Sequence, residues 1–164
     1  MKHFKKIIDI FKNQQIVFWT FLAMLILPNV MMFFTESTST IVRLAGIVFP
    51  LGLYWLAFTL SSKPGKMFWW LFFFVFIDAF QIVLLYLYGE SPIAVDMFLN
   101  LTTTNPTETT ELLSNLLPAV LFVVVVYVSG MVVAVLSILN KEILQPTFRK
   151  LQRKIAYGVM ALGV

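Results

Sequence analysis

Four long apolar runs constrain this chain more than any other feature of its sequence. They cover residues 16–34, 41–60, 67–88 and 116–139. An α-helix rises about 1.5 Å per residue, so roughly 20 apolar residues cross a hydrocarbon core of about 30 Å. Lipid offers the backbone no hydrogen-bond partners, so runs of this kind are predicted to be helices. We therefore expect an all-α, polytopic helical membrane domain.

Composition agrees with this expectation and excludes several functions. Of the 164 residues, 60% are apolar or aromatic and 12% are charged, against about 25% charged residues in an average soluble domain. The chain has no cysteine and a single histidine, His3. Thiolate chemistry is thus excluded, and the ligand cluster of a zinc site is missing. We expect no catalytic residue, cofactor or metal in this chain, and no nucleic-acid partner.

The two ends of the chain have different patterns. In residues 1–15, Phe4, Ile7 and Ile8 recur at helical spacing with lysines largely opposite them, which predicts an amphipathic helix in the membrane interface; a frayed basic tail is the alternative. The last apolar run covers residues 155–164. Ten helical residues rise only about 15 Å. We therefore expect a truncated fifth helix in a longer natural polypeptide.

Basic residues predict the orientation. Four of the twelve lie in the N-terminal arm, two in the 61–66 loop and five in the 140–154 loop, whereas the alternate loops carry only Arg43. Cytoplasmic loops of membrane proteins are enriched in Lys and Arg. The N-terminus is therefore expected in the cytoplasm, and the 89–117 loop is expected on the outer side of the membrane, which in a bacterium is the periplasm.

The 89–117 loop is the longest connection and contains no Lys or Arg; long loops are often functional. Asn105, Pro106 and Glu108 form a typical helix start, with an N-cap, a first-turn proline and a capping-box glutamate. Polar side chains also recur every four residues: Asp96, Asn100, Thr104 and Glu108. The pattern predicts two short interfacial helices that meet near Thr104, because proline disrupts a continuous helix.

A family resemblance lies in the same loop. Three segments resemble the membrane domain of bacterial phosphoethanolamine transferases, a family that includes the lipid A modifying enzymes behind polymyxin resistance. They are Tyr86-Leu87-Tyr88-Gly89, the run MFLNLTTTNPTE at residues 97–108, and Glu111-Leu112-Leu113. That family has an Asn-x3-Thr-x3-Glu pattern after its third membrane helix. By sequence the resemblance covers about twenty residues, and by topology essentially the whole chain.

The resemblance implies a function for the whole protein. Its members join five membrane helices to a periplasmic catalytic domain of the sulfatase type, where a zinc-activated threonine takes phosphoethanolamine from phosphatidylethanolamine. The acceptor is lipid A or a core sugar. Residue matching implies that Asn100, Thr104 and Glu108 bind the lipid headgroup, while Asp96 fits the pattern less well and is a possible helper. The zinc and the nucleophile are expected in the catalytic domain, which this chain lacks.

Other interpretations remain open at this stage. The loop residues could simply cap helices, the parent protein could be a polymerase of the lipoteichoic acid synthase type, and the chain could be a scaffold or transporter-like subunit. A transporter is expected to have discontinuous helices or an internal repeat, and the sequence has no such repeat. Asp78, in the third run, is interpreted as an interhelical hydrogen-bonding residue, with a functional role as the alternative.

Overall fold

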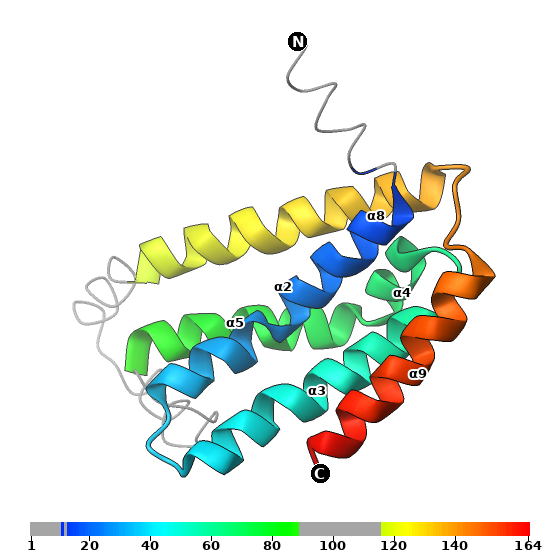
Figure 1. Cartoon of the computed structure of the whole chain (residues 1–164). Coiled ribbons are helices and arrows are strands. Elements are labelled where there is room, and N and C mark those ends of the chain that lie inside the picture. The colour runs from blue at the N-terminus through cyan, green and yellow to red at the C-terminus, as the bar shows by residue number, and fades with distance from the viewer. Residues whose placement is uncertain (1–10, 12, 89–115) are drawn as a thin grey trace.

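The computed structural model describes residue 11, residues 13–88 and residues 116–164, and its regular elements there are all helical. The helices lie roughly along one direction in a bundle (Figure 1). Among the described residues, three helices are long and apolar enough to cross a membrane, or four if a bent pair counts as one span. The predicted all-α class is thereby confirmed.

Helices α2 (Gln14–Thr35) and α3 (Thr40–Leu60) form an antiparallel hairpin. Their bounds lie within two residues of the predicted runs, because length and apolarity alone set them. Asn13 caps the start of α2 and Ser39 that of α3, each accepting a backbone N–H through its side chain, as expected for these residue types.

The third apolar run is not the single helix that the sequence predicted. Helix α4 (Pro64–Trp70) and helix α5 (Phe72–Tyr88) meet at Leu71 with a bend of 71°. Contacts on both sides of Leu71 explain the bend. Phe68 of α4 stacks on Phe21 of α2 at 4.4 Å and is buried, while α5 packs along α2 beyond it. The hydropathy pattern of the sequence gives no indication of this bend.

The fourth run is helical from Leu116 to Leu139 but contains a π-helical turn, η1 (Val124–Val128), before α8 (Ser129–Leu139). A widened turn of this kind inserts an extra residue into the helix and occurs often at functional sites. Here it carries Tyr127, which is buried in the bundle.

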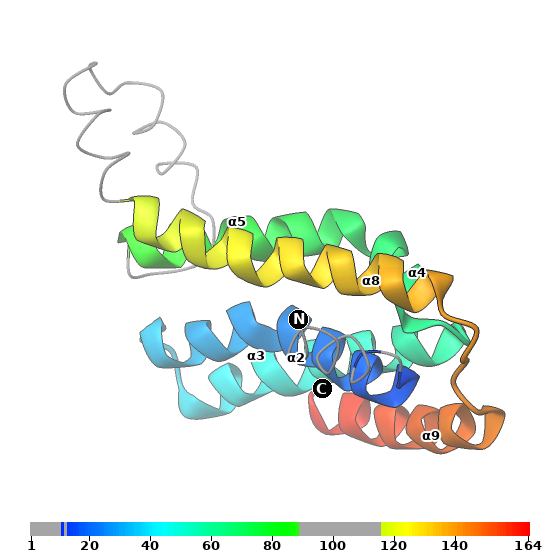
Figure 2. The same ribbon diagram turned by 90° about the horizontal axis from the view of Figure 1, so that it is seen from above.

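Helix α9 (Pro146–Leu162) begins nine residues before the predicted start of the last helix at Ile155. Pro146 occupies the first turn, where proline is favoured, so much of the predicted basic loop is helical. Helix α9 packs along α3, on the side away from α5 and α8 (Figure 2). The contact of Gly163 with Phe49 places its end about halfway along α3.

The core surrounds α2, which contacts α3, α4, α5 and α8. Phe18 and Phe21 are fully buried and pack against Phe58 of α3 at ring distances of 5.9 Å. The outside of the bundle carries many large apolar side chains, among them Trp70, which is 84% exposed. Exposed apolar surface of this extent is typical of a protein that contacts lipid.

Candidate functional site

The bundle has a basic end, which we define by Lys63, Arg149 and Arg153. Lys63 Nζ donates hydrogen bonds to the carbonyl oxygens of Ile138 and Asn140, at 2.6 and 2.7 Å. Arg149 donates to the carbonyl oxygens of Thr59 and Leu60, and Arg153 also bonds to Thr59; the distances are 2.8–3.3 Å. Cations beside the last carbonyls of α3 and α8 complement the helix dipoles.

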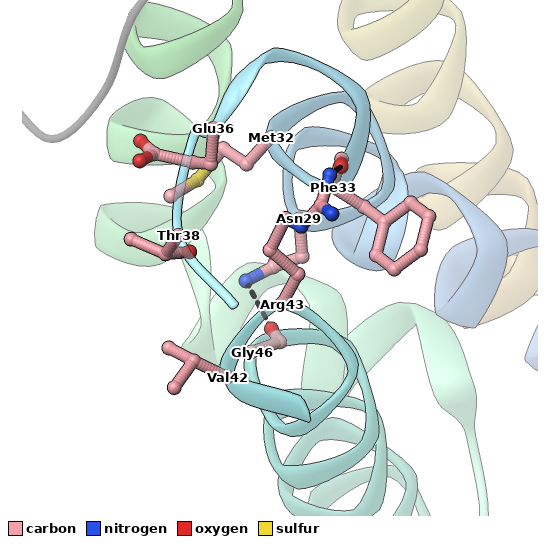
Figure 3. A pocket seen from close by; sticks show the side chains of 8 residues that line it. All are labelled: Asn29, Met32, Phe33, Glu36, Thr38, Val42, Arg43 and Gly46. Atoms are coloured by element: carbon pink, nitrogen blue, oxygen red, sulfur yellow. Dashed lines mark hydrogen bonds between the residues drawn. The ribbon is translucent and has the colours of Figure 1, made fainter. Parts of the chain in front are cut away.

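The candidate site lies at the other end, where a pocket opens between α2 and α3. Its volume is about 210 Å³, several times the roughly 30 Å³ that one water occupies in the liquid. Figure 3 shows the lining side chains, which come from the end of α2, the connecting turn and the start of α3. They are Asn29, Met32, Phe33, Glu36, Thr38, Val42, Arg43 and Gly46.

Arg43 is held firmly in this pocket. One terminal nitrogen donates to the carbonyl oxygen of Phe33 at 3.1 Å, the other donates to Thr40 Oγ1 at 3.4 Å, and the guanidinium lies 5.2 Å from the centre of the Phe33 ring. These contacts hold the guanidinium at the end of α2. Its Nε atom is buried and has no hydrogen-bond partner.

Glu36 supplies the opposite charge. Its Oε1 atom is also buried without a partner. Among the described residues Glu36 forms no ion pair with Arg43, and the two side chains extend in different directions from the pocket (Figure 3). Buried polar atoms are normally hydrogen-bonded. The Arg43 Nε and Glu36 Oε1 atoms are thus exceptions, since both are buried without a partner beside the pocket.

Asn29 and Gly46 also line the pocket. Asn29 Nδ2 donates to the Gly46 carbonyl oxygen at 3.0 Å and joins α2 to α3 beside the pocket (Figure 3). A Cβ atom built on Gly46 would meet nothing within 4 Å. The glycine thus leaves an open notch, bordered by the apolar side chains of Met32 and Val42.

A second polar cluster lies in the middle of the bundle. Tyr54 of α3 hydrogen-bonds to the carboxyl of Asp78 on α5, and Tyr127 of η1 lies within electrostatic range of both. All three residues are buried. The Asp78 Oδ2 atom has no partner, and Tyr127 donates weakly to the Met24 carbonyl oxygen at 3.4 Å. Asp78 therefore joins two helices, as its sequence position predicted.

The headgroup residues predicted from the sequence, Asn100, Thr104 and Glu108, lie outside the described residues, as do the possible helper Asp96 and most of the N-terminal arm. Within the described part of the chain, no group of three or more metal-ligating side chains occurs. Sequence reasoning did not single out Glu36 or Asn29. The one available signal was that Glu36 is the only acidic residue between residues 10 and 77.

Comparison with protein-family models, with curated proteins and with solved structures finds no match to this chain.

Proposed function

We propose that this chain is the membrane domain of a phosphoethanolamine transferase of the bacterial inner membrane, where it anchors a periplasmic catalytic domain and presents phosphatidylethanolamine as the donor. The proposal includes four full crossings, with α4–α5 as the third, and a fifth crossing that begins in α9. In this proposal the full-length protein, and not this membrane domain alone, binds the zinc and the acceptor, which is lipid A or a core sugar.

One observation supports this function best. Lys63, Arg149 and Arg153 gather at one end of the bundle, whereas α5 runs away from that end and the 116–139 helix starts from the far end (Figure 1). If the basic end is cytoplasmic, the 89–115 segment connects these helices on the periplasmic side. The Asn-x3-Thr-x3-Glu pattern would then face a catalytic domain outside the membrane.

The headgroup role of the predicted residues follows from their chemistry. The Glu108 carboxylate can pair with the ammonium group of ethanolamine, while Asn100 and Thr104 can hydrogen-bond to the phosphate and the glycerol oxygens. Such contacts would hold the donor near the surface, where a zinc-activated nucleophile of the catalytic domain could reach its phosphorus atom.

The test uses the full-length protein in a bacterial host whose lipid A lacks phosphoethanolamine. Glu108→Gln should lower the amount of modified lipid A about tenfold at unchanged expression, since charge-assisted hydrogen bonds are worth about 1.5–3 kcal/mol. Mass spectrometry of extracted lipid A measures the transfer. Glu90→Gln, in the same loop but outside the residues that carry the resemblance, is the control. If both variants and the wild type transferred phosphoethanolamine equally well, the headgroup role assigned to Glu108 would be wrong.

Orientation is tested separately, because the chain has no native cysteine. Single cysteines at Thr38 and Thr109 should react with a membrane-impermeant maleimide on spheroplasts, which expose the outer face of the inner membrane. A cysteine at Lys141 should react only after lysis. Labelling of Lys141→Cys and protection of Thr109→Cys before lysis would reverse the orientation and contradict the proposal.

The bent span favours a second candidate, a transporter-like subunit. Transporters often bind substrate where a membrane helix is discontinuous, and α4 and α5 meet at 71°. Helix α4 has only seven residues, however, and its Lys63 and Gly65 bind the end of α8. The break therefore lies toward the basic end of the bundle rather than at mid-span, which argues against a substrate site at the break.

A further inference from the structure

We propose that the outer face of α9 is a binding site for an anionic phospholipid, whose phosphate contacts Lys150 and Lys154 and whose acyl chain follows the apolar side chains further along the helix. Net negative charge, rather than the identity of the headgroup, selects this lipid. The site goes beyond the proposed function, because it lies at the basic end of the bundle and requires no transfer reaction.

The basic residues of α9 form two pairs with different surroundings. Arg149 and Arg153 face α3 and donate hydrogen bonds to the end of that helix. Lys150 and Lys154 each follow an arginine by one position, which turns them about 100° around the helix. Both lysines are exposed, and within the part of the chain that the structure describes neither forms a hydrogen bond or an ion pair. Their charge is thus available to a partner.

The described chain supplies no anion for these lysines. Helix α9 contains no Asp or Glu. Glu142 is the only acidic residue in 116–164, and it lies before the helix and forms no ion pair with another described residue. Lys150 and Lys154 are four positions apart, so their Cβ atoms lie about 6 Å from each other, and one phosphate can contact both ammonium groups. Charge complementarity therefore favours an anionic partner.

The surface beside the lysines identifies that partner as a lipid. Leu151, Ile155, Gly158 and Leu162 recur at intervals of four, three and four residues, so they form one stripe along α9. The three larger side chains of this stripe are 56%, 39% and 84% exposed, and a Cβ atom built on Gly158 would meet nothing within 4 Å. A soluble anion would gain nothing from this apolar surface, whereas an acyl chain would pack along it.

The direction of α9 places headgroup and acyl chain at suitable depths. The helix lies on the outside of the bundle (Figure 2), begins at the basic end and ends beside Phe49, about halfway along α3. Leu162 comes eight residues after Lys154, about 12 Å further along the axis. Trp69 and Trp70 of α4, toward the same end, are exposed, and tryptophan is enriched at membrane–water interfaces. A phosphate at Lys154 therefore lies near the interface, and its acyl chain extends toward the bilayer centre.

The test is native mass spectrometry of the full chain in detergent, titrated separately with phosphatidylglycerol, phosphatidylserine and phosphatidylcholine that carry the same oleoyl chains. Wild-type protein should bind the two anionic lipids equally well and about 25-fold more tightly than phosphatidylcholine, since each surface lysine contributes roughly a fivefold preference for anionic lipid. The double variant Lys150→Gln with Lys154→Gln should lose this preference.

A matched double variant separates the site from the general positive charge of the basic end. Lys66→Gln with Lys141→Gln removes the same charge from two other exposed lysines, outside α9, and should keep the wild-type preference. Lys150→Arg with Lys154→Arg should keep it as well, because both cations remain. All four side chains are exposed, so each variant should unfold at the wild-type midpoint, which is measured alongside binding.

Four results would overturn the assignment. The first is a preference for anionic lipid that survives in Lys150→Gln with Lys154→Gln. The second is an equal loss in Lys66→Gln with Lys141→Gln, which would leave only a diffuse charge. The third is a more than tenfold difference between phosphatidylglycerol and phosphatidylserine. The fourth is binding of soluble glycerophosphoglycerol as tight as that of the lipid, which would make the guest a free phosphodiester. None of these measurements depends on transferase activity, so they leave the proposed function to its own test.

Discussion

The Ser137 hydroxyl donates a 2.7 Å hydrogen bond to Gln14 Oε1, although 123 positions separate the two residues. Ser137 Oγ also accepts the backbone N–H of Gly65 at 3.2 Å. A buried serine on α8 thus connects α2 and α4 at the basic end of the bundle. Each of the three groups would otherwise be a polar group buried without a partner, which is costly.

Ser137→Ala should therefore destabilise the bundle. It leaves Gly65 N–H and Gln14 Oε1 without this partner, and interhelical hydrogen bonds in membrane proteins are worth about 0.6–1.7 kcal/mol each. The midpoint of thermal unfolding in detergent should fall by several degrees. Ser129→Ala, at an exposed position of the same helix, is the control and should not change it. Equal midpoints for the two variants would show that the Ser137 contacts contribute nothing.

Gly65→Ala should destabilise the contact between α4 and α8. A Cβ atom there would clash with the carbonyl oxygen of Ala134 and come within 2.8 Å of Ser137 Cβ, and overpacking of this kind costs about 1–3 kcal/mol. Gly158→Ala has open space around it and should instead stabilise α9 by up to about 1 kcal/mol, because alanine favours helix. Thermal unfolding of both variants measures the contrast, and a change of the same sign in both would contradict it.

The contact of α9 with the end of α3 should require the forked shape of the Arg149 and Arg153 guanidinium groups as well as their charge. The double variant Arg149→Lys with Arg153→Lys keeps the charge but loses the forked contacts with Thr59 and Leu60. We expect a loss of about 1–3 kcal/mol, the range for hydrogen bonds that involve charged groups. The matched control exchanges the exposed Lys150 and Lys154 for arginine. Limited proteolysis of α9 in detergent should separate the two variants; equal cleavage rates would show that charge alone suffices.

Asp78 should tolerate loss of its carboxylate but not of its hydrogen bond. Asp78→Asn keeps an acceptor for Tyr54 and should change stability by less than about 1 kcal/mol, whereas Asp78→Leu leaves the Tyr54 hydroxyl unpaired and should cost about 1–3 kcal/mol. The yield of folded protein and the unfolding midpoint are the measurements. If Asp78→Asn proved as damaging as Asp78→Leu, the carboxylate itself would be required, and a functional role for Asp78 would gain support.

Two parts of the fold could not be predicted from the sequence, namely the bend at Leu71 and the start of α9. The sequence did not indicate the bend at Leu71, because apolar and aromatic residues continue across it from Met67 to Ile77. Contacts of α4 with α2 and α8, among them Phe68 with Phe21 and Gly65 with Ser137, set its direction instead. The sequence suggested a last helix from Ile155, because the basic residues before that point resemble a loop. Those residues instead lie in α9, where Arg149 and Arg153 bind the end of α3.

What the sequence alone determined is the helical class and the extents of α2, α3 and the 116–139 helix. These depend on neighbours within a few positions, since a helix satisfies its backbone within itself. The tertiary structure alone decided which side chains meet. Glu36 and Arg43 share a pocket, and Tyr54, Asp78 and Tyr127 share the interior, because helix packing depends on the shapes of side chains far apart in the sequence.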